Sequence, residues 1–160
     1  MACTLRAATD DDVAELRRWF ANAAAVNIWG GPKFRYPFTP ETFAKDCGLD
    51  IMKSFSLVDS AGRMVAFGQY YYRLGRGHLA RLITKPDMRR RGYGRELIKK
   101  LINAVAAEGK ATEVSLFVYR HNQSAYRCYR SLSFCVQDYP DDAPLKEQCY
   151  FLTRPIDLPQ

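Results

Sequence analysis

The stretch Pro86-Asp87-Met88-Arg89-Arg90-Arg91-Gly92-Tyr93-Gly94-Arg95 decides how the rest of this chain is interpreted. It separates an apolar run over about 78–84, typical of a strand, from an amphipathic run over about 91–108, typical of a helix. Glycines at 92 and 94 remove side chains where the backbone must approach another group closely. The first turn of a helix offers unpaired N–H groups and a positive dipole end, and arginines add phosphate donors. The segment therefore predicts an anion site suited to a pyrophosphate.

The same segment has a simpler interpretation, which is a basic helix start on a solvated surface. Neither common nucleotide signature is present: Leu97 stands where a third glycine would complete G-x-G-x-x-G, and no G-K-[ST] occurs. The distribution of charge is informative. Residues 85–100 carry seven Lys or Arg and two Asp or Glu, so +5 of the chain's net charge of +7 falls there. This concentration favours one local phosphate site over a general polyanion-binding surface.

Composition limits the class of protein. A chain of 160 residues that is 48% apolar can bury a sizeable core, so we expect a single domain over 1–160 and no extended disorder. The five cysteines form no C-x-x-C pair, which argues against a disulfide framework and a zinc site and favours the reducing cytoplasm. No apolar run approaches the roughly 18 residues of a membrane span, and the N-terminus lacks a hydrophobic signal core. We therefore expect neither membrane association nor a metal.

The hydrophobic pattern predicts an α/β (α+β) chain. Gly75 and Gly77 are expected to mark a turn, and hairpins in the middle of the chain exclude a purely parallel sheet. The strand–helix–strand run from 78 to 118 implies a right-handed crossover. We expect a mixed sheet with helices on both faces. The expected strands cover about 3–8, 54–58, 63–73, 78–84, 112–118, 134–139 and 147–153, and the expected helices about 10–25, 40–47, 91–108 and 122–131.

A second motif follows the strand that ends near Val118. Asn122, Ala125, Tyr126 and Tyr129 are spaced three to four apart and share one helical face, a stripe that by itself is more often core. Combined with the arginine–glycine segment, the pattern resembles the GCN5-related N-acetyltransferase (GNAT) superfamily. The matching residues are Arg89-x-x-Gly92-x-Gly94 and Asn122-x-x-Ala125-x-x-x-Tyr129-x-x-x-x-Phe134, with Ser133 where the family usually has glycine. The expected strand order agrees with that fold from end to end.

The resemblance implies a six- to seven-stranded, mostly antiparallel sheet that is splayed in the middle between the strands containing Thr84 and Leu116. It implies transfer of acetyl from acetyl-CoA to a primary amine by direct attack. The backbone near Ile83 would lie along the pantetheine arm, the amides of 90–95 would hold the pyrophosphate, and Asn122 would bind the pantetheine. The implied cofactor-binding residues are Leu82, Ile83, Thr84, Arg89, Arg90, Arg91, Gly92, Tyr93, Gly94, Arg95, Asn122 and Tyr126.

The resemblance also assigns catalytic roles. The Tyr129 hydroxyl would protonate the leaving thiolate, and a backbone N–H near Ile83 or Thr84 would stabilise the oxyanion. His78 occupies the place where several family members carry a catalytic Glu, and a histidine suits deprotonation of an ammonium group. The general base is therefore either His78 or water.

The acceptor amine stays open at this stage. An aromatic loop and two strand tyrosines are candidate walls of its site: Trp29, Phe34, Tyr36, Tyr70 and Tyr72. An acidic cluster at Asp138, Asp141 and Asp142 would suit a polyamine, whereas Lys33 and Arg35 would favour an acceptor that bears a carboxylate. A protein amine is a third possibility. We also expect a homodimer.

Two competing functions remain. The first is a domain that binds acyl-CoA without catalysis, which the presence of Tyr129 and the full arginine–glycine segment disfavour. The second is a nucleic-acid-binding module, which should interleave basic and aromatic residues along a surface. Here the arginines are confined to one turn, so we expect no nucleic-acid partner.

Overall fold

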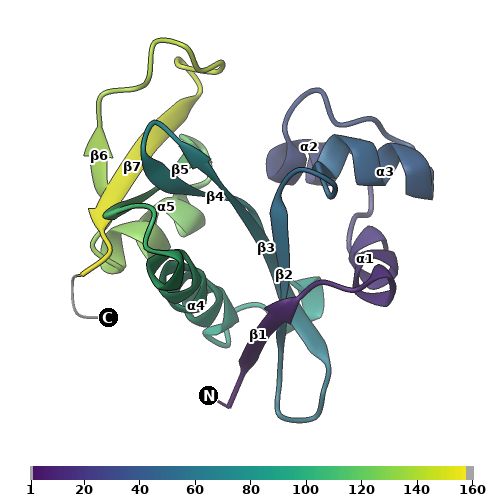
Figure 1. The fold of residues 1–160 in the computed structure, drawn as a ribbon. Helices are drawn as coiled ribbons and strands as arrows, with labels where there is room; N and C mark the ends of the chain where they lie inside the picture. The colour runs from purple at the N-terminus through teal and green to yellow at the C-terminus, as the bar shows by residue number, and fades with distance from the viewer. Residues whose placement is uncertain (1, 158–160) are drawn as a thin grey trace. The chain divides into compact units, whose positions relative to one another are not determined.

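The computed structural model describes residues 2–157. The chain divides into two compact units. Within the described residues, unit 1 consists of residues 2–70 and 81–98, and unit 2 consists of residues 71–80 and 99–157. Figure 1 shows the helices and strands along the chain. Whether 1–160 is a single domain stays a prediction.

Seven strands form one mixed sheet in the order β1-β2-β3-β4-β5-β7-β6 within the described residues. They are β1 (Thr4–Ala7), β2 (Lys53–Val58), β3 (Met64–Arg73), β4 (Arg76–Thr84), β5 (Glu113–Tyr119), β6 (Cys135–Gln137) and β7 (Cys149–Pro155). The pairs β1–β2, β2–β3, β5–β7 and β6–β7 are antiparallel, and β4–β5 is parallel. The mostly antiparallel sheet of the expected α/β class is therefore confirmed.

The parallel pairing of β4 with β5 is short. It joins Gly77 to Val114 and His78 to Ser115, although β4 continues to Thr84 and β5 to Tyr119. The antiparallel ladder on the other side of β5 is longer and runs from Glu113 to Tyr119. The expected splay between the strands that contain Thr84 and Leu116 stays a prediction.

Three short helices precede β2 in unit 1: α1 (Asp10–Arg17), α2 (Ala23–Gly30) and α3 (Pro40–Cys47). Thr39 caps α3 and Pro40 occupies its first turn, as the sequence predicts. The expectation of one helix over 10–25 was wrong. The Asn22 side chain accepts a hydrogen bond from the Ala25 backbone N–H at 2.9 Å and starts a new helix. Asparagine is among the best residues for such a cap, and its effect outweighs continuation of α1.

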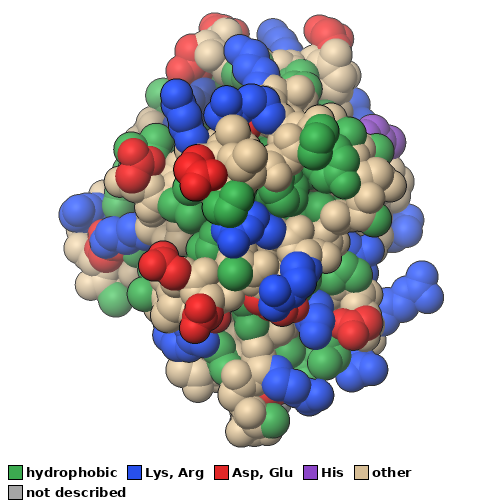
Figure 2. All heavy atoms as spheres, turned by 90° about the vertical axis from the view of Figure 1, so that its right-hand side faces the viewer, with side chains coloured by type: hydrophobic (Ala, Val, Ile, Leu, Met, Phe, Trp, Pro, Cys, Tyr) green, Lys and Arg blue, Asp and Glu red, His purple; other side chains and the backbone are tan. Residues whose placement is uncertain are grey.

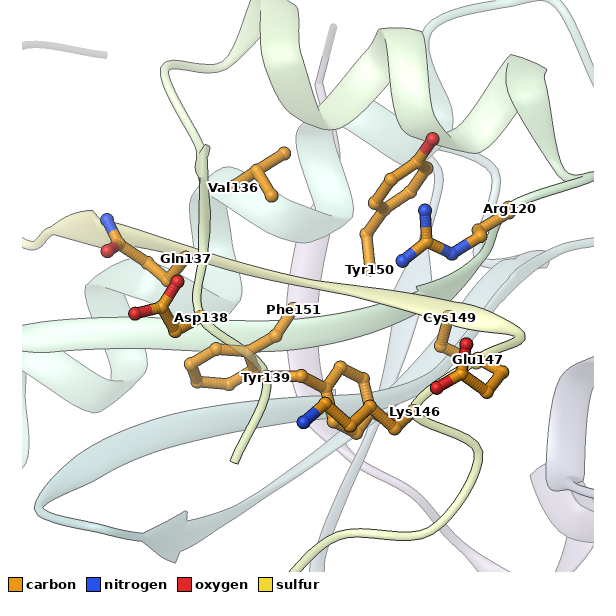
Figure 3. Close-up of a pocket in the computed structure, with 10 residues that line it drawn as sticks. All are labelled: Arg120, Val136, Gln137, Asp138, Tyr139, Lys146, Glu147, Cys149, Tyr150 and Phe151. Atoms are coloured by element: carbon orange, nitrogen blue, oxygen red, sulfur yellow. The ribbon is translucent and has the colours of Figure 1, made fainter. Parts of the chain in front are cut away.

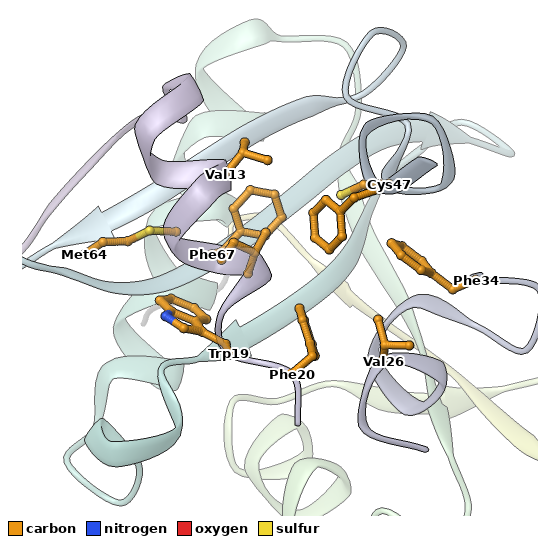
Figure 4. Close-up of a cluster of buried hydrophobic side chains, with 10 residues drawn as sticks. Val13, Trp19, Phe20, Val26, Phe34, Cys47, Met64 and Phe67 are labelled. Atoms are coloured by element: carbon orange, nitrogen blue, oxygen red, sulfur yellow. The ribbon is translucent and has the colours of Figure 1, made fainter. Parts of the chain in front are cut away.

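Aromatic side chains from α2 and α3, from the loops that flank these helices and from β3 form the core of unit 1 (Figure 4). The Trp29 ring stacks on Phe43 with centroids 5.8 Å apart, and Phe34 packs against both rings. Phe20 lies 4.7 Å from Trp29, between ring centroids. Burial of apolar area at roughly 25 cal/mol per Å² makes such a cluster a main source of stability.

In unit 2, β7 pairs with β5 on one side and with β6 on the other. The helices here are α5 (Gln123–Ser131) and the C-terminal part of α4 (Tyr93–Glu108). The buried Arg154 guanidinium donates to the Leu132 carbonyl oxygen at 2.9 Å, which ties β7 to the end of α5.

The hairpin between β3 and β4 corrects the expected role of one glycine. Leu74 and Gly75 form the turn with φ of 50° and 75°, the signs of a type I′ turn. Gly77 lies inside β4 and is buried, so it is not part of the turn. A Cβ placed on it would lie 2.5 Å from Val105 Cγ1 of α4, so glycine here permits close helix–strand packing.

We predict that Gly77→Ala lowers the free energy of unfolding by about 1–3 kcal/mol, because the added methyl group overpacks the contact with Val105. Urea unfolding followed by circular dichroism measures this loss. Val105→Ala removes the opposing methyl groups, so the double variant should lose less than the sum of the two single variants. Additive losses would contradict the proposed contact.

Candidate functional site

The arginine–glycine segment adopts a specific backbone in unit 1. After β4, the Lys85 N–H donates to the Val65 carbonyl oxygen at 2.8 Å, and Pro86–Met88 form a 3-10 turn. Arg90 and Gly92 then take left-handed φ values of 65° and 86°, and α4 begins at Tyr93. This path directs the chain into the first turn of α4, where N–H groups lack helical acceptors.

The arginines of the segment lie on the protein surface. Arg89, Arg90, Arg91 and Arg95 are exposed. A Cβ on Gly94 would lie 3.5 Å from Thr84 Oγ1, so this glycine stands beside the end of β4. The exposed guanidinium groups, the two left-handed residues and the helix start together suit a phosphate-bearing ligand.

An irregularity in β4 precedes Leu82, Ile83 and Thr84. Arg81 has a φ of 50°, a left-handed conformation that is uncommon for a residue other than glycine. The Arg81 carbonyl oxygen accepts a hydrogen bond from the Trp29 indole N–H at 2.7 Å. Its guanidinium donates to Gln69 Oε1 and to the Asp46 carbonyl oxygen, both at 3.1 Å. Sequence reasoning missed Arg81, because no local pattern indicates left-handed arginine.

His78 is buried in unit 2, with a relative exposure of 2%. Its Nδ1 lies 2.8 Å from Ser115 Oγ, and its ring packs against Tyr71 and Phe117. Burial, together with the positive charge of Arg73, lowers the pKa of His78 to about 3. The imidazole is therefore neutral at physiological pH, and its protonated form is strongly disfavoured. This environment makes His78 a weak base.

Helix α5 carries the second predicted motif. Asn122 caps it, since its Oδ1 accepts from the Ala125 backbone N–H at 3.4 Å. The Tyr129 ring lies 6.1 Å from that of Phe134, and the Tyr129 carbonyl oxygen accepts from the Phe134 N–H. Desolvation raises the pKa of the Tyr129 hydroxyl far above its ordinary value, with a smaller contribution from Cys128. Tyr129 therefore keeps its proton at neutral pH.

The helix exit departs from the family pattern without disturbing the motif. Ser133 takes a φ of 72°, the conformation that the usual glycine adopts easily. Tyr126, on the same helix, packs against Tyr150 with ring centroids 4.9 Å apart.

The predicted acceptor-site aromatics differ in their accessibility. Phe34 and Tyr70 are 5% and 2% exposed, and Tyr70 stacks on Phe55 at 5.4 Å between centroids. Trp29 is half-buried in the aromatic core of unit 1. Tyr36, at 39%, has an exposed ring, and Tyr72 is half-buried in unit 2 with its ring under the Lys110 ammonium group. The burial of Phe34 and Tyr70 favours packing roles for these two.

A surface pocket of about 290 Å³ lies in unit 2 beside β7 (Figure 3). It is lined by aromatic rings, two basic side chains and two carboxylates. Arg120 lies over the Tyr150 ring at 4.4 Å from its centroid, and the Tyr139 hydroxyl donates to the Pro144 carbonyl oxygen at 2.6 Å. Its lining residues are Arg120, Val136, Gln137, Asp138, Tyr139, Lys146, Glu147, Cys149, Tyr150 and Phe151.

Surface charge, helix hydrophobicity and possible metal ligands are relevant to nucleic-acid, membrane and metal binding. Figure 2 shows one face of the molecule, on which Lys and Arg side chains are interspersed with acidic and apolar ones. Over residues 2–157, no helix is both long enough and apolar enough to cross a membrane. The same residues contain no group of three or more His, Cys, Asp or Glu side chains placed to hold a metal ion.

Comparison with known proteins establishes the family. The model of the acetyltransferase (GNAT) family matches residues 14–134, so the chain belongs to this family. The ribosomal protein bS18-alanine N-acetyltransferase of Escherichia coli K12 is 33% identical over 99 residues. That match covers 62% of this chain and 65% of the relative, so it spans less than two thirds of the relative's length.

Solved structures share the fold over nearly the whole chain. The aminoglycoside acetyltransferase AAC(6')-Ib, in complex with paromomycin and acetyl-CoA, has a TM-score of 0.76 at 19% identity and matches 97% of this chain and 94% of its own. Spermidine N-acetyltransferase from Vibrio cholerae, in complex with CoA and spermine, has a TM-score of 0.72 at 16% identity, with 96% and 95% coverage. At these identities the likeness concerns the fold.

We predict that the free energy of unfolding falls as the pH drops from about 6.5 towards 3. The pKa of His78 is about 3 in the fold and near 6.5 when unfolded, so the unfolded chain binds the extra proton in this interval. The stability contributed by neutral His78 is complete above pH 6.5. Its loss amounts to several kcal/mol, at about 1.4 kcal/mol per pKa unit. Urea unfolding at several pH values measures it.

His78→Asn, which keeps a polar group near Ser115, should flatten this pH dependence. His121→Asn is the matched control, because His121 is the other histidine of the chain and is exposed. The control should keep the wild-type slope. A slope that is the same in all three proteins would rule out His78 as its source.

Proposed function

We propose that this chain is an N-acetyltransferase that transfers the acetyl group of acetyl-CoA to a primary amine. The observation that carries the proposal is the path from β4 into α4, with left-handed Arg90 and Gly92, in a chain of the GNAT family. The names of the relatives support it, since those proteins are N-acetyltransferases and two neighbours were solved with CoA or acetyl-CoA.

The residues near the start of α4 fit a CoA pyrophosphate. The N–H groups from Arg90 to Arg95 are proposed to donate to it, with Arg89 and Arg91 as exposed cations beside them. Leu82, Ile83 and Thr84 are proposed to bind the pantetheine arm through their backbone, together with Asn122 and Tyr126. The left-handed Arg81 immediately precedes these residues, and its conformation is proposed to set the direction of their backbone groups.

During acetyl transfer the protein must stabilise the negative oxygen and protonate the departing sulfur. The amine nitrogen forms a bond to the thioester carbonyl carbon while the carbon–sulfur bond breaks. A backbone N–H at Ile83 or Thr84 is proposed to stabilise the oxygen that becomes negative. Tyr129 is proposed to donate its proton to the departing sulfur, which suits a hydroxyl that stays protonated at neutral pH.

The amine must lose a proton before or during attack. His78 was one candidate base and water was the other. A pKa of about 3 makes neutral His78 a poor acceptor for an ammonium proton, so we propose that water carries this proton away. We propose that His78 stays neutral during the reaction and keeps its hydrogen bond with Ser115.

We also propose that residues 1–160 act as one catalytic domain in the cytoplasm. The elements β3, β4 and α4 each contribute residues to both compact units, which favours a single domain. Five cysteine residues without a C-x-x-C pair suit a reducing compartment. The expected homodimer stays a prediction, which light scattering of the purified protein tests.

Tyr129→Phe is predicted to lower kcat about 100-fold while changing the KM for acetyl-CoA less than about threefold, because it removes a proton donor and leaves the ring in place. Release of free thiol from acetyl-CoA in the presence of an amine panel measures turnover. Tyr119→Phe, which removes a hydroxyl at the end of β5, is the control. Wild-type kcat in Tyr129→Phe would exclude Tyr129 as the acid.

Gly92→Val is predicted to raise the KM for acetyl-CoA at least about tenfold, because a branched side chain disfavours the φ of 86° and occupies space beside the α4 amides. Gly62→Val is a matched control. Gly62 has a φ of 83° in the turn after β2 and no atom within 4 Å of its added Cβ. If both variants bind acetyl-CoA equally, backbone strain alone explains the effect and the assignment of the segment fails.

A further inference from the structure

Arg73, the last residue of β3, lies against an aromatic surface of unit 2. Its Cζ atom is 5.7 Å from the centroid of the Phe117 ring. Phe117 in turn lies 5.1 Å from Tyr139 and 4.7 Å from His78, and Tyr71 lies 5.3 Å from His78, all between ring centroids. We call Tyr71, His78, Phe117 and Tyr139 the aromatic face.

The charge of Arg73 is only partly compensated. Its side chain is 19% exposed, and Nη2 donates to Asp142 Oδ1 at 2.9 Å. Asp142 is itself 64% exposed, so water screens this pair and weakens it. The Nε atom of Arg73 is buried and has no hydrogen-bond partner. A buried donor without an acceptor costs free energy, and a second carboxylate oxygen at Nε would remove that cost.

Two other arginines of the described chain are less suited to bind a carboxylate. Arg35, a sequence-based candidate for binding a carboxylate, donates to Asp46 through Nε at 3.0 Å and through Nη2 at 2.9 Å. The Nε and Nη2 donors of Arg35 are therefore already bonded to a carboxylate. Arg81 also has an unpaired buried Nε, but its Nη atoms are bound to groups of unit 1, among them Gln69 Oε1 and the Asp46 carbonyl oxygen.

The acidic cluster considered as a polyamine site is altered by the same contact. Asp142 is paired with Arg73, so its charge is partly neutralised. Burial is the main cause of the lowered pKa of His78, and the positive charge of Arg73 adds to it, in keeping with the position of Arg73 against the aromatic face. A polycation would be repelled by this charge, and an anion would be attracted.

We propose that Arg73 binds the carboxylate of the acceptor, so that the acceptor is an amine carrying a carboxylate, such as an apolar or aromatic α-amino acid. This inference rests on the proposed acetyltransferase function. The carboxylate pairs with Nε and Nη2 in the bidentate geometry that guanidinium groups favour, and it displaces exposed Asp142. The half-buried rings of Tyr71, Phe117 and Tyr139 then contact the apolar part of the acceptor, while His78 stays buried beneath them.

The test compares free amino acids with their α-carboxamides, which differ only in the group that Arg73 would bind. Phenylalanine, leucine and methionine and their carboxamides are assayed with acetyl-CoA by thiol release. The wild-type protein should prefer at least one acid over its carboxamide. Arg73→Gln should lower kcat/KM for that acid about 10- to 100-fold and leave the carboxamide nearly unchanged. Arg73→Lys should recover part of the loss.

Two further variants sharpen the result. Asp142→Asn removes the internal competitor, so it should raise kcat/KM for the preferred acid only. Arg63→Gln is the matched control, because Arg63 also pairs with an aspartate, Asp59, but has an exposed side chain near the start of β3, and it should behave like the wild type. A wild-type protein that does not distinguish acid from carboxamide, or an Arg73→Gln variant that loses both equally, would overturn the proposal.

Calorimetric titration of the same acids into the protein with CoA separates the two levels of inference. If spermidine or a peptide amine is acetylated while no acid binds, the acetyltransferase function stands and the carboxylate site is wrong. If no amine is acetylated but an acid binds in an Arg73-dependent way, the carboxylate site stands and the acetyltransferase function is wrong. Circular dichroism of each variant confirms that it is folded.

Discussion

The left-handed backbone of Arg81 is the constraint on which the geometry of unit 1 depends. A non-glycine residue in this conformation costs free energy and persists only when its surroundings hold it in place. Here the carbonyl oxygen is fixed by Trp29 of α2, and the guanidinium is bound by Gln69 of β3 and the Asp46 carbonyl oxygen of α3. One residue thereby joins two helices to the strand that leads into the arginine–glycine segment, and the aromatic core around Trp29 stabilises the arrangement.

The sequence predicts those features of the structure that are determined by neighbouring residues. The cap at Thr39 and Pro40, the start of α5 at Asn122 and the passage from β4 to α4 were predicted because neighbouring residues determine them. The interruption of the helix at Asn22 was not predicted, because the apolar spacing continues through this residue. Only the geometry of the helix cap reveals the interruption. Gly77 was misplaced in a turn because its partner, Val105, is remote in sequence.

The candidate site follows the same division. The motif residues from Arg89 to Arg95 and from Asn122 to Tyr129 were found from spacing and resemblance, whereas Arg73 and Arg81 were not. The sequence marks an arginine in a strand as a charge, and only the fold shows which of its nitrogen atoms are buried and which have acceptors. Likewise, the pattern indicates His78 as a base candidate, but the burial that depresses its pKa comes from Tyr71, Phe117 and the β5 strand.

Exposure, more than net charge, separates the functions that we propose for the basic residues. The arginines at 89–91 and 95 are exposed and lie in the stretch that holds most of the chain's charge excess, where they suit a multiply charged phosphate group. Arg73 lies outside that stretch, so the distribution of charge along the sequence does not single it out. Yet a guanidinium that is mostly buried and incompletely paired discriminates more strongly between a carboxylate and a neutral group than an exposed one does, because water competes less for it. The charge that we propose binds the donor and the charge that we propose selects the acceptor thus differ in their exposure to water.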